Sequence, residues 1–170
     1  VNKKDFSSAT VKYVIANQKF VFTVLNDDSC SPGEVGVSAL LRRWANVSIS
    51  EVVSIQPFDP ASVDGGQQIY LGNLSLEVGF NRKILERKEE FDTQEMGKAF
   101  CNAYDQQIFS LGQDLAFDFR GVNLAIKVTG VDVVDLDVLK KGTGAPSSNS
   151  NKQRGIVMKQ TTISFTKAPD

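Results

Sequence analysis

The sequence predicts a mixed β and α+β protein of two subdomains, in which a small β-barrel precedes a subdomain of strands with one main helix. Three observations support this prediction. Short segments rich in β-branched and aromatic residues, separated by turn formers, fill the first third of the chain. A stretch dense in glycine and aspartate then interrupts the apolar pattern. Longer alternating runs and one segment with helical spacing follow it.

Short strands and turns make up the first subdomain, and a small barrel suits them because its closure hides the edges of the strands. The hairpin is the best defined part, since Asn17-Gln18 separates two strand-like runs. In order, we expect strands at 11–15 and 19–25, a loop at 26–33, a strand at 35–37, a helical turn at 40–45 and a strand at 52–55 closed by Pro57.

A domain junction is predicted at residues 61–68, where the chain is poor in large apolar groups and rich in turn formers. Residues 1–60 then form the barrel, and residues 69–170 form the second subdomain. The 170 residues suffice for two small hydrophobic cores, so both subdomains are expected to fold.

The second subdomain combines strands with one helix. Asp92 followed by Glu95 is typical of a helix start, and the apolar residues after it recur at helical spacing. We expect the main helix near 92–108, with its apolar stripe in the core. Residues near 140–154 have little to bury, which predicts a mobile loop. The predicted strands are one long bent strand or two short ones within 69–80, a pair at 115–119 and 124–128 joined by Arg120-Gly121, a bulge at Gly130, and final strands at 155–158 and 161–165.

The composition limits the class of protein. There are 19 basic and 20 acidic residues, and the resulting net charge of -1 gives no broad basic field for nucleic acid or an anionic membrane. No apolar run is long enough to span a bilayer, and the first residues lack the apolar core of a signal peptide. Cys30 and Cys101 are too few and too far apart for a disulfide framework, so we expect free thiols in a cytoplasmic protein.

No catalytic, metal or cofactor site is predicted in this chain. The absence of histidine removes the common nucleophile–histidine pairs and the histidine-containing zinc sites. Neither a dinucleotide-binding glycine motif nor a GxxxxGK[ST] loop occurs, so the chain is not expected to bind ATP. We interpret the acidic groups as solvated loop charges; they are Asp27-Asp28, Asp132 with Asp135 and Asp137, and Glu86 with Glu89-Glu90.

Two basic clusters are the candidate binding residues. Arg42 and Arg43 precede the only tryptophan, and Arg82 with Lys83 begins a charged connector further along the chain. A guanidinium beside an aromatic ring suits recognition of carboxylates on a partner protein. Alternatively, Trp44 fills the barrel and the arginines are merely solvated. The residues themselves favour neither interpretation.

Four motifs resemble the N-terminal domain of the N-ethylmaleimide-sensitive fusion factor (NSF) family, including its fungal members. They occur in the same order along nearly the whole chain, as VNKKDF at 1–6, LRRWA at 41–45, FDTQEM at 91–96 and FSLGQ at 109–113. Residues 24–30 and 53–57 are also similar to the N domain of valosin-containing protein, so these two stretches indicate a shared fold.

The resemblance implies a double-psi β-barrel subdomain with a truncated first strand, followed by a small α/β roll. Members of the family are hexameric AAA+ ATPases. They use this non-catalytic domain to dock a SNAP adaptor on SNARE complexes for ATP-driven disassembly, in vesicle fusion and in transport between endoplasmic reticulum and Golgi. ATP, Mg²⁺ and the hexamer would then belong to ATPase domains outside this chain. The implied location is cytoplasmic, with recruitment to membranes through partners and no direct insertion.

The resemblance also implies which residues bind. In the family, basic residues of the barrel and of the groove between subdomains face acidic SNAP side chains. Arg42 and Arg43 match the barrel pair. The family's second pair, two lysines, aligns with Lys83 and Ile84, so Arg82 is the candidate substitute for the missing charge. Together these four basic residues form the implied adaptor-binding set.

Two alternatives to the adaptor-binding function remain open on the sequence. A domain like that of valosin-containing protein would recognise ubiquitin-fold or cofactor proteins through an apolar cleft. A stand-alone enzyme on a double-psi barrel, such as an aspartic protease, would need paired carboxylates. The chain has neither an Asp-Thr-Gly nor an Asp-Ser-Gly motif, which speaks against the protease.

Overall fold

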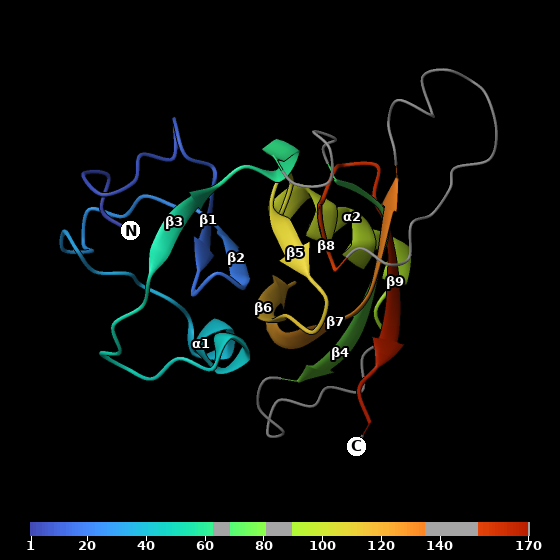
Figure 1. The fold of residues 1–170 in the computed structure, drawn as a ribbon. Helices are drawn as coiled ribbons and strands as arrows, with labels where there is room; N and C mark the ends of the chain where they lie inside the picture. The colour runs from blue at the N-terminus through green and yellow to red at the C-terminus, as the bar shows by residue number, and fades with distance from the viewer. Residues whose placement is uncertain (63–68, 81–89, 135–152, 170) are drawn as a thin grey trace. The chain divides into compact units, whose positions relative to one another are not determined.

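The computed structural model describes residues 1–62, 69–80, 90–134 and 153–169 (Figure 1). The chain divides into two compact units, Val1–Gln67 and Gln68–Asp170. The second basic cluster and nearly all of the loop expected near 140–154 fall outside the described residues. Within the described ranges, no helix is both long and apolar enough to cross a membrane.

The first unit is built on a three-stranded antiparallel sheet of order β2-β1-β3. Its elements are β1 (Tyr13–Ala16), β2 (Phe20–Thr23), α1 (Ala39–Ala45), β3 (Ile55–Phe58) and the 3-10 helix η1 (Pro60–Ser62). The hairpin of β1 and β2 confirms the sequence prediction. Asn17 and Gln18 have φ angles of 48° and 58°, the positive values that a type I′ turn needs at both central residues.

The strand expected at residues 35–37 does not form, and this prediction is wrong. The N–H group of Glu34 closes a turn onto the carbonyl of Ser31, so the chain is still turning where the strand was expected to start. Val35 is 40% exposed, and no strand of the described sheet pairs with this segment. An apolar residue between two turn regions was therefore misread as part of a strand.

The strand expected at 52–55 is shifted along the chain. It begins at Ile55 and contains Pro57, whereas Val52 is 96% exposed. Pro57 pairs with Val14 of β1, and β3 lies at the edge of the described three-stranded sheet. An edge strand tolerates a proline because the missing N–H group can face away from the neighbouring strand. The proline therefore lies inside the strand and does not end it.

A six-stranded mixed sheet forms the second unit. Its strands are β4 (Tyr70–Phe80), β5 (Ile108–Ser110), β6 (Asp114–Phe119), β7 (Val122–Val134), β8 (Arg154–Ile156) and β9 (Thr162–Lys167). The order is β5-β8-β4-β7-β6, and β9 also pairs with β4. β7 runs antiparallel to β4, whereas β8 and β9 pair with it in parallel. The run within 69–80 is thus one long strand, the first of the two possibilities that the sequence left open.

Two register shifts interrupt the pairing of β4 with β7, one between Leu71 and Asn73 and the other between Ser75 and Leu76. Gly130 pairs with Ser75 at the second shift, so the bulge predicted at this glycine is confirmed. A Cβ atom at Gly130 would lie 3.0 Å from the Ser75 side chain. The two strands approach each other closely at this point, and the missing side chain allows it.

The hairpin of β6 and β7 matches its prediction, with Arg120 and Gly121 at φ angles of 53° and 76° in the turn. The Arg120 guanidinium pairs with Glu95 in the first turn of the second unit's helix. It also lies 5.4 Å from the centroid of the Phe119 ring. The turn therefore fastens the hairpin to the helix.

The main helix, α2 (Thr93–Ala103), begins where the sequence predicts. The Asp92 carboxylate accepts hydrogen bonds from the N–H groups of Gln94 and Glu95, at 2.8 and 3.2 Å. These bonds satisfy two of the donors that a helix start leaves without partners. Glu95 does not complete a capping box, because its carboxylate pairs with the β6–β7 turn.

The helix ends at Ala103, earlier than the boundary expected near 108. Gln106 has a φ angle of 64°, and its N–H group donates to the carbonyl of Val157 at 2.9 Å. The N–H group of Val157 returns a bond of 2.9 Å to Gln107. The chain thus leaves the helix to pair with the segment after β8, and this tertiary pairing overrides the helical spacing of the sequence.

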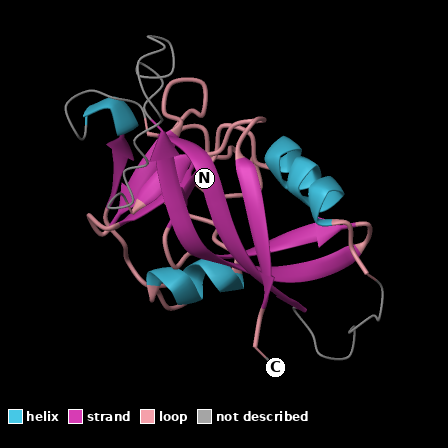
Figure 2. Ribbon diagram, turned by 90° about the vertical axis from the view of Figure 1, so that its right-hand side faces the viewer, coloured by secondary structure: helices cyan, strands magenta, loops and turns pink. Residues whose placement is uncertain are grey.

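Helix α2 lies against strands of the sheet (Figure 2). Met96, Phe100 and Cys101 on this helix are buried, which agrees with the interpretation of its apolar stripe as core. Phe100 is fully buried, and its ring centroid lies 5.3 Å from that of Phe117 and 5.7 Å from that of Phe109. Tyr104 joins this cluster and donates its hydroxyl to the carbonyl of Ala116 at 2.8 Å, while burial raises the pKa of the Tyr104 phenol. Burying one large apolar side chain contributes about 1.5–3 kcal/mol, so the cluster is a major source of stability for this unit.

Candidate binding surface

Both ends of α1 are capped by side-chain and backbone hydrogen bonds. The Ser38 hydroxyl accepts from the N–H group of Leu41 at 3.3 Å at the helix start. Asn46 ends the helix in the left-handed conformation, with a φ angle of 52°, and its N–H group donates to the carbonyl of Arg43 at 3.1 Å. A helix of seven residues is not stable alone, so its position depends on these caps and on tertiary packing.

Trp44 supplies that packing. Its ring meets Phe20 edge-on, with centroids 5.0 Å apart, and Phe22 in the same manner at 5.5 Å. Both phenylalanines lie on one face of β2, two residues apart, so the tryptophan seats α1 on the strand. Of the two roles that the sequence left open for Trp44, the structure favours packing over exposure as an interface anchor.

Arg42 and Arg43 lie in the last turn of α1. Arg42 is partly exposed and Arg43 is exposed. Consecutive helical residues point about 100° apart, so the two side chains leave the helix in different directions. Neither guanidinium forms an ion pair with another of the described residues. The structure therefore presents two accessible cations on a helix whose tryptophan is committed to packing.

Sequence reasoning missed Lys19, which lies beside the same aromatic side chains. Its Nζ atom is 5.2 Å from the centroid of the Phe20 ring, and Phe20 in turn contacts Trp44. The sequence does contain a signal for this residue, because a lysine lies between the two-residue turn Asn17-Gln18 and an aromatic strand. We call Lys19, Arg42 and Arg43, with Phe20 and Trp44, the cationic face.

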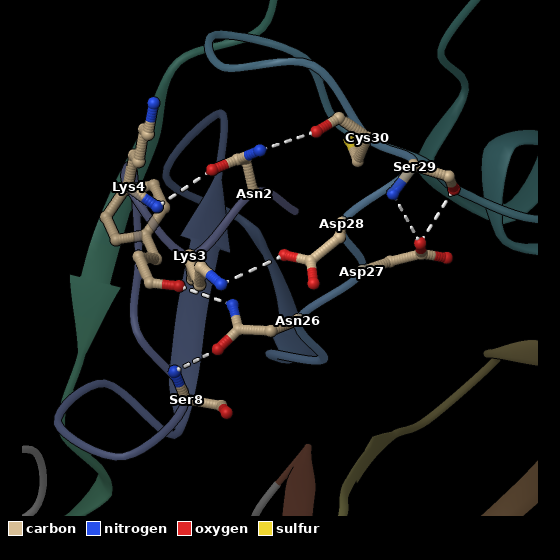
Figure 3. A network of polar contacts seen from close by, with 10 residues as sticks. Asn2, Lys3, Lys4, Ser8, Asn26, Asp27, Asp28, Ser29 and Cys30 are labelled. Carbon is tan, nitrogen blue, oxygen red and sulfur yellow. Dashed lines mark hydrogen bonds and ion pairs between the residues drawn. The ribbon is translucent and has the colours of Figure 1, made fainter.

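A different polar arrangement occupies the start of the chain and the loop after β2, as Figure 3 shows. The Asn26 amide donates to the carbonyl of Phe6 at 2.7 Å, and its oxygen accepts from the N–H group of Ser8 at 2.8 Å. Lys3 pairs with Asp28 at 3.3 Å. We call residues 1–8 with 26–33, joined in this way, the N-terminal network.

The acidic pair in this loop has a structural role. Asp27 accepts hydrogen bonds from the hydroxyl and the N–H group of Ser29, at 2.7 and 2.8 Å. These two bonds lower the pKa of the Asp27 carboxyl. Asp5 accepts from the N–H group of Gly33 at 2.8 Å, which ties the same loop to the start of the chain. Asp27 and Asp28 are exposed loop charges, as interpreted from the sequence, but they also form contacts within the fold that this interpretation did not include.

Both cysteines are free thiols, as the sequence predicts. Cys101 is buried, and its Sγ atom lies 3.3 Å from the carbonyl of Thr161. Burial and the nearby charge of Asp105 raise the pKa of the Cys101 thiol, so it stays protonated and unreactive. Among the described residues, no three Cys, Asp or Glu side chains are grouped so that they could hold a metal ion.

Arg82 and Lys83 lie outside the described residues. Of the predicted binding set, Arg42 and Arg43 lie within the described residues, in α1, and Lys19 lies over the ring of Phe20, which contacts Trp44 of that helix.

Comparison with known proteins identifies the relatives of this chain. Residues 90–167 match the family model of cell division protein 48 (CDC48), domain 2. The chain is 33% identical to vesicular-fusion protein sec18 of Schizosaccharomyces pombe over 168 residues. These aligned residues are 99% of this chain and 20% of that protein. It is 31% identical to SEC18 of Saccharomyces cerevisiae, over 93% of this chain and 20% of that protein. The vesicle-fusing ATPase of Caenorhabditis elegans is 27% identical, over 92% of this chain and 20% of its own length.

The chain is a relative of the NSF-type N domain. The resemblance inferred from its motifs is thereby confirmed. With the two-unit structure, the match also confirms the fold class, a double-psi β-barrel subdomain followed by a small α/β roll. The chain spans about a fifth of the length of the vesicle-fusion relatives that it matches.

Proposed function

We propose that this chain is the non-catalytic, adaptor-binding N domain of a hexameric AAA+ ATPase. In this proposal it docks a SNAP adaptor on SNARE complexes, which the ATPase then disassembles in vesicle fusion and transport. The names of the relatives, vesicular-fusion protein and vesicle-fusing ATPase, support the process. The observation that carries the binding role is the accessible pair Arg42 and Arg43, which has no acidic partner among the described residues.

The chemistry of this pair suits weak and reversible docking. A guanidinium binds a carboxylate in a fixed fork geometry, so two of them can align an acidic surface of the adaptor. Exposed ion pairs contribute about 0 to 1 kcal/mol each and weaken as salt is added. One domain would therefore bind loosely, and several domains of a hexamer would together hold the adaptor by avidity.

ATP hydrolysis in this proposal belongs to parts of the protein outside this chain. Relatives of about five times the length are named as ATPases, and this chain matches only a fifth of them. ATP and Mg²⁺ would bind in those other domains. The proposed location is the cytoplasm, with recruitment to membranes through the adaptor.

Charge reversal tests the binding role. We expect the double variant Arg42→Glu and Arg43→Glu to lose most of its binding to an immobilised, SNAP-coated SNARE complex, because two attractive contacts become repulsive. The thermal unfolding midpoint is expected to stay the same, since neither guanidinium supports the fold through an ion pair with a described residue. Lys12→Glu is the matched control, as an exposed cation of the same unit away from α1. If the double variant binds as tightly as the wild type, the assignment of Arg42 and Arg43 to the binding surface is wrong.

The CDC48 match over residues 90–167 favours one alternative, recognition of ubiquitin-fold or cofactor proteins. Titration of the chain against ubiquitin and against SNAP on its SNARE complex separates the two. Saturable binding to ubiquitin that survives reversal of the arginine pair would support the alternative. Binding to SNAP alone would support the adaptor role.

A further inference from the structure

Residues 48–52, between α1 and β3, are all exposed. Among them Ile49 is 76% exposed and Val52 is 96% exposed, so two large apolar side chains lie outside the core. Ser50 has a φ angle of 62°, in the left-handed region that a serine seldom occupies. Exposed apolar side chains and a strained residue within one short segment are typical of a site that another protein recognises.

The segment is fastened to the rest of the first unit at its two ends. Before it, the backbone is bonded to the carbonyl of Arg42 at 3.0 Å, and after it Ser54 exchanges two hydrogen bonds with Asn17, at 2.8 and 3.1 Å. Within it, the Ser48 N–H group donates to the Glu51 carboxylate at 2.7 Å, and the Glu51 N–H group donates to the Ser48 carbonyl at 3.4 Å. The segment can therefore open without losing a hydrogen bond to another described element.

Ser48 and Glu51 also form a pattern that protein kinases recognise. Acid-directed kinases prefer a serine or threonine followed three residues later by an acid, because a basic substrate groove binds that carboxylate. Three such patterns occur in the sequence, at Ser31, Ser48 and Thr129. The pattern alone is common, so its accessibility in the structure decides which of the three a kinase can use.

Two of the three patterns are held within the fold. Thr129 lies inside strand β7. The loop around Ser31 belongs to the N-terminal network, where the N–H group of Gly33 donates to Asp5 at 2.8 Å. A kinase acts on a segment that has opened from the surface, and at these two places opening would break contacts with other elements. Ser48 is exposed, and its hydroxyl forms no hydrogen bond with a described residue.

We propose that Ser48 is a phosphorylation site for a serine/threonine kinase directed by Glu51. The kinase transfers the γ-phosphoryl group of ATP to the Oγ atom of Ser48. The bond between the γ-phosphorus and the bridging oxygen of ADP breaks, the bond to Oγ forms, and the hydroxyl proton passes to the base of the kinase. The exposed Ile49 and Val52 follow Ser48 and Glu51 directly, where they can contact the kinase.

The phosphate changes the charge at the end of α1. It adds about 1.5 to 2 negative charges at pH 7, two residues after the Asn46 cap. The last carbonyls of the helix and the carboxylate of Glu51 repel it, whereas Arg42 and Arg43 in the last turn attract it. Phosphorylation thus offsets the positive charge of the arginine pair and weakens docking of the adaptor. This regulatory part of the inference rests on the proposed function.

Phosphorylation of the folded chain tests the site. The probe is casein kinase II, an acid-directed kinase, with ATP, and mass spectrometry locates the phosphate. We expect modification of Ser48, and Ser48→Ala should remove it. Glu51→Gln keeps an acceptor for the Ser48 N–H group but loses the charge, so it should slow the reaction about tenfold or more.

Thr129 is the matched control for accessibility. We expect it to stay unmodified in the folded chain, although a synthetic peptide of the sequence around it should react. If Ser48 stays unmodified in the folded chain, or if Glu51→Gln reacts as fast as the wild type, the proposed site is wrong.

Binding of the phosphorylated chain separates the regulation from the proposed function. We expect it to bind the immobilised SNAP-coated SNARE complex about fivefold to tenfold more weakly than the unmodified chain. If Ser48 is modified and the affinity is unchanged, while the double variant Arg42→Glu and Arg43→Glu has lost binding, the regulatory role is overturned and the adaptor function stands. If the arginine variant also binds normally, the proposed function fails, and the modification site is judged by the kinase reaction alone.

Discussion

In the N-terminal network, Lys3 pairs with Asp28 and the neighbouring acids accept hydrogen bonds from backbone N–H groups. On the cationic face, Arg42 and Arg43 have no acid in the surrounding segment of sequence. The two regions belong to the same unit and are both well exposed. In the first, charges are used within the fold and contribute to its stability. In the second, Arg42 and Arg43 form no ion pair with a described residue, so substitutions in the two regions should change different measurements.

The largest expected effect is on stability at the aromatic side chain beneath the cationic face. Trp44→Ala removes the contacts with Phe20 and Phe22 that seat α1 on β2. We expect the free energy of unfolding of the first unit to fall by about 2–4 kcal/mol, the range for loss of a large packed ring. Chemical denaturation monitored by circular dichroism measures it. Trp44→Phe, which keeps a ring, should lose much less; equal losses would show that the ring contacts do not hold α1.

A smaller effect on stability is expected in the N-terminal network. Asn26→Ala removes both bonds that tie the loop to Phe6 and Ser8, and we expect a loss of about 1 kcal/mol for bonds in an exposed setting. Adaptor binding should not change. Asn26→Asp is the matched control, because it keeps the acceptor for Ser8 but not the donor to Phe6. If Asn26→Ala instead bound the adaptor weakly and unfolded as the wild type does, the N-terminal network would serve binding and not stability.

The smallest expected effect is a pH dependence at Asp27. Its pKa is lowered from 3.8 by the hydrogen bonds from Ser29, so the stability it contributes is present above the unfolded pKa and is lost as the pH falls through the lower folded value. Thermal midpoints of the wild type and of Asp27→Asn should therefore differ at neutral pH and converge in strong acid. A difference that grows on acidification would contradict this assignment.

Local rules predicted much of the fold. The Asn17-Gln18 and Arg120-Gly121 turns and the start of α2 at Asp92 each depend on a few adjacent residues, and each was found as expected. Two of the errors have a common cause. The strand with Pro57 and the early end of α2 both depend on which distant segment pairs with the chain, and spacing alone does not contain that information.

In the candidate site, too, some residues could be predicted from their neighbours in sequence and others only from tertiary contacts. Arg42 and Arg43 stand out locally, because two arginines precede the only tryptophan. Lys19 joins them only through the contact of Phe20 with Trp44, which brings β2 and α1 together. The role of Trp44 was undecidable for the same reason, since a packed ring and an exposed ring have the same neighbours in sequence.

The pairing of β4 has a consequence for how the protein is made. β4 hydrogen-bonds to β9, and the Ser164 hydroxyl reaches Asn73 from 91 residues further along the chain. A ribosome must therefore release nearly the whole second unit before its central strand gains its last neighbour, and closing so long a loop slows folding. The sheet of the first unit, by contrast, is complete once β3 has emerged, so this unit can form while the rest is still being synthesised. The first unit, with the cationic face, is thus synthesised before the central strand of the second unit gains its last neighbour.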